Sequence, residues 1–331
     1  MFTSYFKIAA RHIARNRSYV LINVVGLGIA IACTMIAFVN WKAGNYADSF
    51  HENYDRLFRV IAVTPSTTAP TANLSSPLAP TAAADIAGIE AGIRFDRRTA
   101  IISLDDKIYE ERVATVDPNF LEVFTFPLIE GKKSALEDPN QLLISQRMAE
   151  KYFPETSALG QLLTVNPNQA GGRKMVVGGV FENVKSQNSS LVFDFLTNID
   201  YVETGMVSDT LAKWDNRVDA TFVLLTNPNE SEVIAEQMNR YIPVQNDAMP
   251  GDKRSSYLLQ PMNDVYMGGL DVNNNWINKA ISPAFYWGPW VMALMILLTA
   301  CLNFTNTTIS FSNKRLKEMG IRKVMGSNRI Q

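Results

Sequence analysis

The chain has 331 residues, 47% of them hydrophobic and 19% charged, and its formal net charge at pH 7 is −1. The first 18 residues carry +4 and the last 20 carry +5, so the remainder must carry about −10. Basic residues cluster only at the two ends, which argues against a nucleic-acid-binding domain. Both cysteines, Cys33 and Cys301, lie in apolar stretches, which excludes a disulfide framework for the region between them.

Residues 1–18 are predicted to form an amphipathic helix in the membrane interface. On a helical wheel the apolar and basic side chains separate onto opposite faces. The apolar face consists of Phe2, Tyr5, Phe6, Ala9 and Ile13, and the basic face of Lys7, Arg11 and Arg15. Such a helix lies on an anionic leaflet with its apolar side down. The alternative is a basic tail that only sets the topology.

Residues 19–41 are predicted to form the first transmembrane helix. This stretch contains no Asp, Glu, Lys or Arg. At ~1.5 Å per residue it spans ~34 Å, enough to cross a bilayer. The apolar run is longer than the core of a cleavable signal peptide, so we expect an uncleaved anchor. Four small residues form two overlapping pairs that favour close helix packing: Gly26, Gly28, Ala30 and Ala32.

Residues 42–283 are predicted to form an external α+β domain with two lobes. The strand-like stretches are 56–64, 93–95, 107–116, 162–165, 174–181 and 220–225. The helical stretches are 81–87, 145–153 and 230–241. Strand and helix signals at both ends, with mainly strands between them, indicate that one lobe is inserted into the other. We expect the membrane-proximal lobe to contain about 43–98 and 218–275, and the inserted lobe about 99–217.

Residues 284–311 are predicted to form the second transmembrane helix. Basic residues dominate beyond it as they do before the first span, so both termini are expected in the cytoplasm and the acidic region outside. Five polar residues share one helical face: Thr299, Asn303, Asn306, Thr307 and Ser310. Because a polar stripe facing lipid is costly, we expect it to pack against other helices or to line a water-filled path. The alternative places the end of this span at the membrane interface.

The sequence contains no recognisable catalytic, metal-binding or cofactor-binding motif. A phosphate-binding loop of the form G-x-x-x-x-G-K-[ST] is absent. The only histidines, His12 and His51, are predicted on opposite sides of the membrane. The glycine pairs at 171–172 and 178–179 fit a hairpin and a β-bulge better than a phosphate cradle. We therefore expect a protein that is not an enzyme and that holds no metal or cofactor.

The most specific pattern follows the second span. Residues 300–306 read ACLNFTN and residues 314–326 read KRLKEMGIRKVMG. Together they closely resemble the second membrane helix and the following cytoplasmic segment of MacB/FtsX-type ABC transporter permeases, with Ser327 where the family usually has Ala. Further similarity, to the first span and to the periplasmic core domain of that family, lies in residues 21–30, 143–153 and 176–181.

The resemblance implies a two-lobed MacB-like periplasmic core domain, held in the inner (plasma) membrane by spans on either side, and a cytoplasmic coupling segment at 312–331. The residues that would contact an ABC ATPase are Lys317, Glu318, Met319, Gly320, Ile321, Arg322, Lys323, Val324, Met325 and Gly326. Gly320 is expected to end the helical extension of the second span and to let a second helix turn along the membrane. ATP would then be bound by the partner and not by this chain.

The resemblance also implies mechanotransmission, in which ATP-driven motion reaches the periplasmic domain and drives export or efflux of a peptide, antibiotic or lipoprotein. The implied partners are the ABC ATPase, a second permease half or a second copy of the chain, a periplasmic adaptor and membrane lipids, but no nucleic acid. Further spans are expected after Gln331 in the complete protein. The alternative is a two-span sensor with an external ligand-binding domain, but such proteins continue into heptads, which residues 316–331 lack.

Overall fold

The computed structural model describes residues 17–105, 107–166, 172–184, 188–200, 212–267, 271–277 and 283–325. The chain divides into two compact units. The helical unit contains Met1–Lys42 and Pro283–Gln331, and the folded unit contains Ala43–Ser282. The interfacial helix predicted at 1–18 lies almost entirely outside the described residues, which begin at Arg17.

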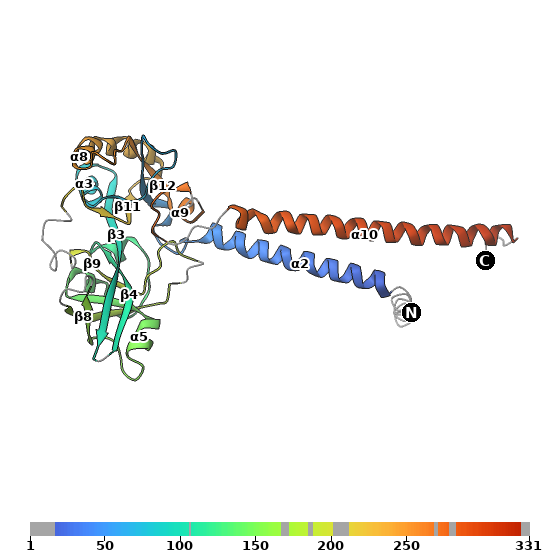
Figure 1. The fold of residues 1–331 in the computed structure, drawn as a ribbon, viewed down its shortest axis with the longest axis horizontal. Helices are drawn as coiled ribbons and strands as arrows, with labels where there is room; N and C mark the ends of the chain where they lie inside the picture. Colours follow the sequence, from blue (N-terminus) through green and yellow to red (C-terminus); the bar gives the residue numbers. More distant parts are fainter. Residues whose placement is uncertain are drawn as a thin grey trace. The chain divides into compact units, whose positions relative to one another are not determined.

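The helical unit consists, in its described part, of two long helices, α2 (Arg17–Tyr46) and α10 (Pro283–Val324), which run alongside each other (Figure 1). Their 30 and 42 residues correspond to ~45 Å and ~63 Å at ~1.5 Å per residue. The stretches Val20–Lys42 and Trp287–Asn306 are long and apolar enough to cross a membrane. They coincide with the two spans predicted from the sequence.

The described part of the folded unit is built on one mixed sheet of ten strands. The strands are β1 (Leu57–Val63), β3 (Ile89–Leu104), β4 (Lys107–Val116), β5 (Leu128–Gly131), β6 (Gln141–Ser145), β7 (Leu162–Asn166), β8 (Arg173–Phe181), β9 (Phe195–Asn198), β11 (Ala220–Leu225) and β12 (Ser256–Pro261). Their order is β12-β1-β11-β3-β4-β9-β6-β8-β5, and β7 pairs with both β3 and β8. A separate antiparallel pair joins β2 (Leu74–Ser75) to β10 (Arg217–Val218).

Six strands of this sheet close into a ring. Each strand pairs with the next in the order β3-β4-β9-β6-β8-β7, and β7 pairs back to β3. The long strand β3 makes this possible because its two halves have different neighbours. Residues 89–95 pair with β11, whereas residues 101–103 pair with β7. Strand β3 therefore belongs both to the ring and to the open part of the sheet.

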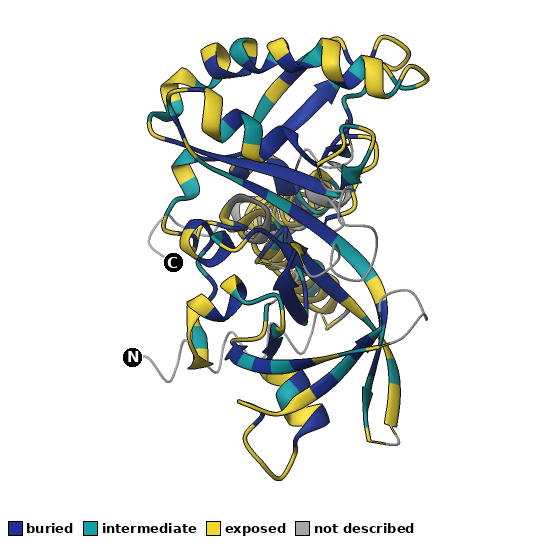
Figure 2. Ribbon diagram, turned by 90° about the vertical axis from the view of Figure 1, so that its left-hand side faces the viewer, coloured by how far each residue is buried: buried dark blue, intermediate teal, exposed yellow. Residues whose placement is uncertain are grey.

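Helices cover both parts of the sheet. The helices α3 (Leu78–Asp85), α7 (Ser231–Met238) and α8 (Ile242–Ala248) lie beside the open part, and α5 (Gln146–Tyr152) lies beside the ring (Figure 1). Figure 2 shows mainly buried strands and exposed outer helix surfaces. The short elements are α4 (Phe120–Val123), α9 (Met262–Met267), and the 3-10 turns η1 (Tyr54–Arg56), η2 (Lys133–Glu137), η3 (Pro228–Glu230) and η4 (Asn239–Tyr241).

Three large clusters of buried apolar side chains hold the folded unit together. The shared core includes Leu57, Ile93, Phe95, Phe120, Phe124, Leu143, Phe181, Phe193, Phe222 and Val265. The ring core includes Ala100, Ile102, Val113, Leu142, Ile144, Met148, Tyr152, Val165, Met175 and Phe195. The helix-covered core includes Phe58, Val60, Leu78, Val223, Leu225, Ile234, Met238 and Tyr257. Neighbouring residues of one strand fall into different cores because successive side chains point to opposite faces of a sheet.

The predicted division into two lobes, with 99–217 inserted between 43–98 and 218–275, is not confirmed. The shared core contains residues from both stretches: the Phe95 and Phe120 rings lie 6.4 Å apart, and the Phe124 and Phe222 rings lie 5.2 Å apart. Strand β3 also passes through the predicted boundary without a break. One face of the sheet is therefore common to both stretches, and only the other face carries separate cores.

Local sequence signals explain where several predicted elements begin. Ser145 starts α5 as predicted, because its Oγ accepts a hydrogen bond from the backbone N–H of Met148 at 3.3 Å. Helix α3 begins at Leu78, three residues earlier than the predicted start at 81. The earlier start is possible because Pro80 lies in the first turn, where a helix needs no backbone N–H from it.

The glycine pair at 178–179 forms the predicted β-bulge. Leu142 pairs with Val177 and Leu143 pairs with Gly179, so Gly178 is the extra residue on β8. The bulge also allows a close approach of β5, because a Cβ on Gly131 would lie 2.3 Å from the carbonyl oxygen of Gly178. The predicted hairpin at 171–172 falls mostly outside the described residues.

Candidate functional site

The helical unit has a seam at which small residues recur. Along one face of α2 the described residues with reduced exposure include Gly26, Ala30, Cys33, Ala37 and Asn40. In α10 the corresponding run is Pro289, Ala293, Ile296 and Ala300. Both runs alternate steps of four and three residues, the spacing at which two helices pack along one face. Small side chains let the two backbones approach closely where Ala30, Ala37 and Ala293 are buried, whereas nothing lies within 4 Å of a Cβ added at Gly26.

Only half of the small residues predicted to favour helix packing lie on this seam. Gly26 and Ala30 lie on it, whereas Gly28 and Ala32 are exposed. The division follows from helix geometry, since residues two positions apart point ~200° away from each other. Ala37, which was not predicted, is fully buried on the seam. The spacing of small residues by four and then three was the signal that could have identified it.

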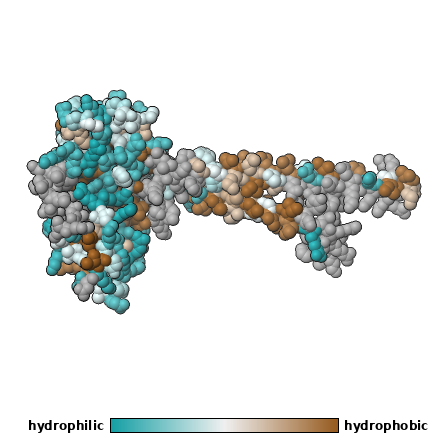
Figure 3. Space-filling model, in the orientation of Figure 1, coloured by the Kyte–Doolittle hydropathy of each residue, from teal (hydrophilic) through white to brown (hydrophobic). Residues whose placement is uncertain are grey.

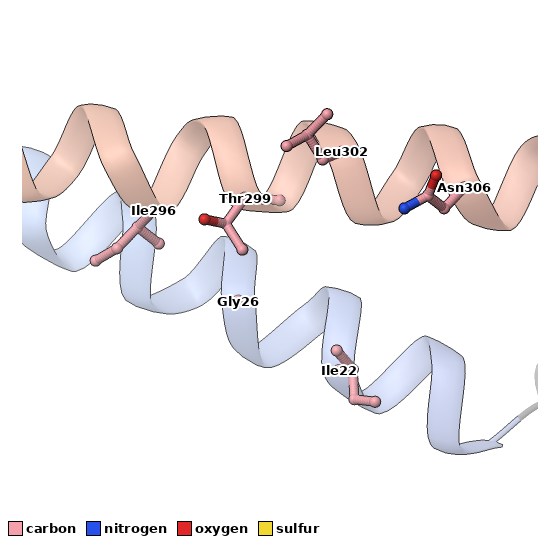
Figure 4. A pocket seen from close by; sticks show the side chains of 7 residues that line it. Ile22, Gly26, Ile296, Thr299, Leu302 and Asn306 are labelled. Atoms are coloured by element: carbon pink, nitrogen blue, oxygen red, sulfur yellow. The ribbon is translucent and has the colours of Figure 1, made fainter.

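A groove lies between α2 and α10 (Figure 4). Its volume is about 440 Å³, and it is lined by Ile22, Gly26, Ile296, Thr299, Ala300, Leu302 and Asn306. In Figure 4 the side chains of Ile296 and Thr299 point towards α2. The groove is mostly apolar, so its chemistry suits a hydrocarbon chain or another helix better than a polar solute.

The structure brings two members of the predicted polar stripe, Thr299 and Asn306, to this groove. The Thr299 hydroxyl donates to the Met295 carbonyl at 2.8 Å, so its hydrogen-bonding need is met within the helix. The side chains of Asn303, Thr307 and Ser310 lie outside the described set. The role predicted for the stripe in helix packing therefore rests on Thr299 and Asn306.

The predicted coupling segment continues α10 without interruption. Helix α10 extends through Gly320 to Val324, so the expectation that Gly320 ends the helix is wrong. A single glycine costs only ~1 kcal/mol in a helix, and good helix formers flank this one. Lys317, Met319, Ile321, Val324 and Met325 are exposed. The side chains of Glu318, Arg322 and Lys323 and the whole of Gly326 lie outside the described set.

The surfaces of the two units differ in chemical character. On the face seen in Figure 3, apolar side chains dominate the long helices and hydrophilic ones dominate the folded unit. The exposed apolar residues of the helices include Leu21, Val24, Met35, Phe38, Met292, Leu298, Leu302 and Phe304. Helices that are apolar around most of their circumference are those that lie in lipid.

The chain enters the folded unit from α2 through a buried polar cluster that was not predicted. Asp48 follows the end of α2 by two residues and has a left-handed backbone conformation, with φ 61°. Its Oδ1 accepts hydrogen bonds from the Ser189 hydroxyl at 2.9 Å and the Ser190 backbone N–H at 2.8 Å. Its own N–H donates to the Asn188 carbonyl at 2.7 Å. Asp48 thereby joins the first residues of the folded unit to a segment about 140 positions away.

His51 extends this cluster. Its Nδ1 accepts a hydrogen bond from the Thr125 backbone N–H at 3.0 Å, so the ring proton must lie on Nε2, 3.8 Å from Asp48 Oδ1. Burial among the rings of Phe50, Phe124 and Phe126 lowers the pKa of His51 to about 4. Burial also raises the pKa of Asp48. His51 is therefore neutral at pH 7, and its N–H does not suit a metal ion.

The segment that leads towards α10 carries a second buried polar contact. Arg59 of β1 is fully buried, and burial lowers the pKa of its guanidinium to about 10. Its Nε and Nη2 donate to Gln260 Oε1 at 2.9 and 2.6 Å, and its Nη1 donates to Asn275 Oδ1 at 2.8 Å. Asn275 lies eight residues before α10 begins. Arg59 thus holds the end of the folded unit onto the sheet.

No catalytic constellation emerges from the described residues. They contain no group of three or more His, Cys, Asp or Glu side chains that could hold a metal ion. Burial shifts the pKa of several groups away from ordinary values, among them Asp48, His51, Arg59 and Asp219. Asp48, His51 and Arg59 are buried, and their hydrogen bonds hold the segments next to the two long helices.

Comparison with solved structures finds similar domains. A domain of a putative permease protein from Porphyromonas gingivalis is 28% identical, with a TM-score of 0.52, over 64% of this chain and 92% of that chain. The extracellular domain of the ABC-type transporter YknZ from Gram-positive bacteria is 14% identical, over 62% and 99%, with a TM-score of 0.44. The periplasmic region of MacB from Actinobacillus actinomycetemcomitans is 12% identical, over 63% and 90%, with a TM-score of 0.45.

Comparison with curated proteins gives no match. The sequence profile of the MacB-like periplasmic core domain matches residues 20–241, about two thirds of the chain. The match begins within α2 and ends at Tyr241, so it includes the first span and most of the folded unit. The chain therefore belongs to the family of ABC transporter permeases that carry a MacB-like periplasmic core domain.

Proposed function

We propose that this chain is the permease subunit of a MacB/FtsX-type ABC transporter and passes ATP-driven motion of a partner ATPase to its folded unit. The observation that carries the proposal is the match to the MacB-like periplasmic core domain over 20–241, together with apolar helices on both sides of the folded unit. In this arrangement the chain is not an enzyme and needs no cofactor, because ATP is bound by the partner.

In the proposed orientation both termini are in the cytoplasm and the folded unit lies on the outer side of the inner membrane. The basic ends and the acidic centre of the sequence support this orientation. Lipids would contact the exposed apolar faces of α2 and α10. A second permease half or a second copy of the chain, and a periplasmic adaptor, would complete the assembly.

The proposed work is export or extrusion of a substrate such as a peptide, an antibiotic or a lipoprotein. We propose that the ring of strands and the open part of the sheet act as the two moving lobes of this process. Their separate cores on one face of the sheet support such movement, and their shared core on the other face limits it. Strand β3 would be the hinge because it belongs to both parts.

The coupling surface is proposed to lie on the last turns of α10. Leu316, Met319 and Ile321 offer exposed apolar contacts, and Glu318 and Arg322 add opposite charges at a spacing of four residues. Because α10 continues unbroken to Val324, a rotation or shift of its cytoplasmic end would be carried along the same helix towards the folded unit.

The test is a double charge reversal, Glu318→Lys with Arg322→Glu, in the full chain purified from its native membrane. We expect an ABC ATPase to co-purify with the unaltered chain. The reversal should weaken this association, since breaking an interface charge pair costs about 2–5 kcal/mol. Stimulated ATP hydrolysis should fall with it.

The matched control reverses two exposed charges of β4, Lys107→Glu with Glu110→Lys. This change is expected to leave co-purification unaltered. Equal ATPase recovery from both double variants would show that the end of α10 is only a basic flank. If no ABC ATPase co-purifies with the unaltered chain, and ligand binding to the folded unit alters a cytoplasmic coiled coil instead, the sensor alternative is correct.

A further inference from the structure

We propose that Asp48 is the positioning residue that fastens the exit of the first membrane helix to the ring of strands, so that movement of α2 is transmitted and not absorbed by residues 47–53. The inference rests on the proposed function and names the residue through which the first helix acts. Its starting point is the place of Asp48 in the chain, two residues after α2 ends.

The hydrogen bonds of Asp48 lead directly to the ring. Its carboxylate and its backbone N–H together contact Asn188, Ser189 and Ser190. This segment continues through Phe193 of the shared core into β9, a ring strand that begins at Phe195. Asp48 lies two residues after the end of α2, and its partner Ser190 lies five residues before the start of β9. The connection from α2 to the ring through this hydrogen bond is therefore short.

The backbone of Asp48 supports the same role. A φ of 61° turns the chain sharply and is unfavourable for most residues with a side chain, although Asp and Asn tolerate it. The turn sends the carboxylate inwards, where its side chain is fully buried. The turn and the buried carboxylate together fix the position of Asp48 relative to Ser189 and Ser190.

A second row of contacts keeps the following residues in place. The Thr125 N–H donates to His51 Nδ1 at 3.0 Å, and the Glu52 N–H donates to Thr125 Oγ1 at 2.9 Å. The Asn53 side chain donates to the Val123 carbonyl at 3.0 Å. Residues 48–53 are thus held at two places, and Asp48 supplies the hydrogen bonds to the segment that runs into β9.

The electrostatics explain why this carboxylate is a fastening point and not an ordinary surface acid. The neighbouring His51 is neutral, and Asp48 Oδ2 has no hydrogen-bond partner among the described residues. A buried carboxylate without a cation depends on its hydrogen bonds for stability. Loss of Ser189 and Ser190 from Oδ1 would be costly, so the segment at 188–190 is held tightly.

The experiment measures whether residues 47–53 stay fixed to the ring. Spin labels are placed on cysteines at the exposed positions Ser49, next to Asp48, and Lys174, in the full chain with Cys33 and Cys301 replaced by alanine. The chain is studied in nanodiscs with the ATPase that co-purifies with it. The width of the distance distribution is recorded without nucleotide and with ATP and vanadate.

Asp48→Gly is the main variant, because glycine adopts the same φ but has no carboxylate. We expect a narrow distribution in both nucleotide states for the unaltered residue. Asp48→Gly should broaden it at least twofold, most clearly with ATP and vanadate. Asp48→Asn should restore the narrow distribution, since its amide oxygen still accepts hydrogen bonds and Asn tolerates the left-handed turn.

The matched control is Asp117→Ala, which removes another buried carboxylate, one that accepts from Arg94 on β3. It should lower stability without broadening the Ser49–Lys174 distance distribution. A distribution as narrow in Asp48→Gly as in the unaltered chain would overturn the inference. If Asp48→Gly broadens the distance distribution without nucleotide but no ATPase associates with the unaltered chain, the fastening role of Asp48 stands and the proposed function is contradicted.

Discussion

At the scale of single residues, three buried polar groups of the folded unit hold the segments that connect to the membrane helices. Asp48, His51 and Arg59 are all buried and polar. Asp48 and His51 follow α2, and Arg59 holds Asn275 ahead of α10. The three large cores between these points are formed by apolar side chains. Hydrogen bonds give direction to an attachment, whereas apolar packing alone is non-directional.

The neutral state of His51 leads to a prediction about pH. Its pKa is about 4 in the folded protein and 6.5 in the unfolded reference, so between these values the unfolded chain binds the extra proton. Stability contributed by this group is therefore lost as pH falls from 6.5 to 4 and regained as pH rises. At ~1.4 kcal/mol per pKa unit the full change over about 2.5 units is about 3.5 kcal/mol.

The measurement is urea unfolding of the folded unit in the detergent-solubilised chain at several pH values. The free energy of unfolding of the unaltered protein minus that of His51→Gln should rise by about 3 kcal/mol from pH 4 to 6.5. The subtraction removes contributions from other groups, including Asp48, whose raised pKa acts in the opposite direction. Parallel pH profiles for the two proteins would show that His51 is already protonated in the folded state.

At the scale of elements, two backbone features decide how the strands and helices fit. Helix α10 tolerates Gly320 because the flanking residues favour the helix. At Gly131, by contrast, glycine is required. This residue ends β5 with φ 87°, and it lies directly against the bulge of β8 at Gly178. The same residue type is therefore replaceable in one element and required in the other.

Replacing Gly131 by alanine is expected to destabilise the folded unit by about 3 kcal/mol or more. The new Cβ would lie 2.3 Å from the Gly178 carbonyl oxygen, and the residue would also have to keep a positive φ. Gly160→Ala is the matched control, because its φ is 80° but nothing lies within 4 Å of the added Cβ. The control should cost only ~1–2 kcal/mol. Equal losses for the two variants in urea unfolding would mean that β5 moves freely away from the bulge.

At the scale of the whole molecule, the distribution of charge agrees with the two candidate spans. The acidic residues lie mainly in the folded unit, and the basic ends belong to the helical unit. An orientation with the folded unit outside satisfies the positive-inside rule at both helices.

Labelling of single cysteines tests this orientation. In a chain without Cys33 and Cys301, Lys107→Cys should react with a membrane-impermeant thiol reagent in cells with a permeabilised outer envelope and an intact inner membrane. Lys317→Cys should react only after the inner membrane is opened. Both positions are exposed, so their reactivity reports sidedness and not burial. Immediate reaction at Lys317→Cys with protection of Lys107→Cys would reverse the proposed topology.

The sequence by itself determined the features that depend on residues close together in the chain. Uncharged runs of more than twenty residues defined two membrane-length helices, Ser145 determined the start of α5, and the glycine pair at 178–179 determined a bulge. The order KRLKEMGIRKVMG and the landmarks of the core domain pointed to the family. These signals are visible without a fold because helix length, capping and bulges are governed by neighbouring residues.

Only the tertiary structure decided how distant segments combine. It joined the two predicted lobes through β3 and a shared core, and it extended α10 past Gly320. It also brought Asp48 to Ser189 and Arg59 to Asn275, pairs separated by 141 and 216 positions. No local pattern marks such pairs, because a strand shows which residues alternate but not which strand it will pair with. The pairing of strands decides whether a carboxylate or a guanidinium becomes buried. It therefore also decided that Asp48 and Arg59 hold the segments next to α2 and α10.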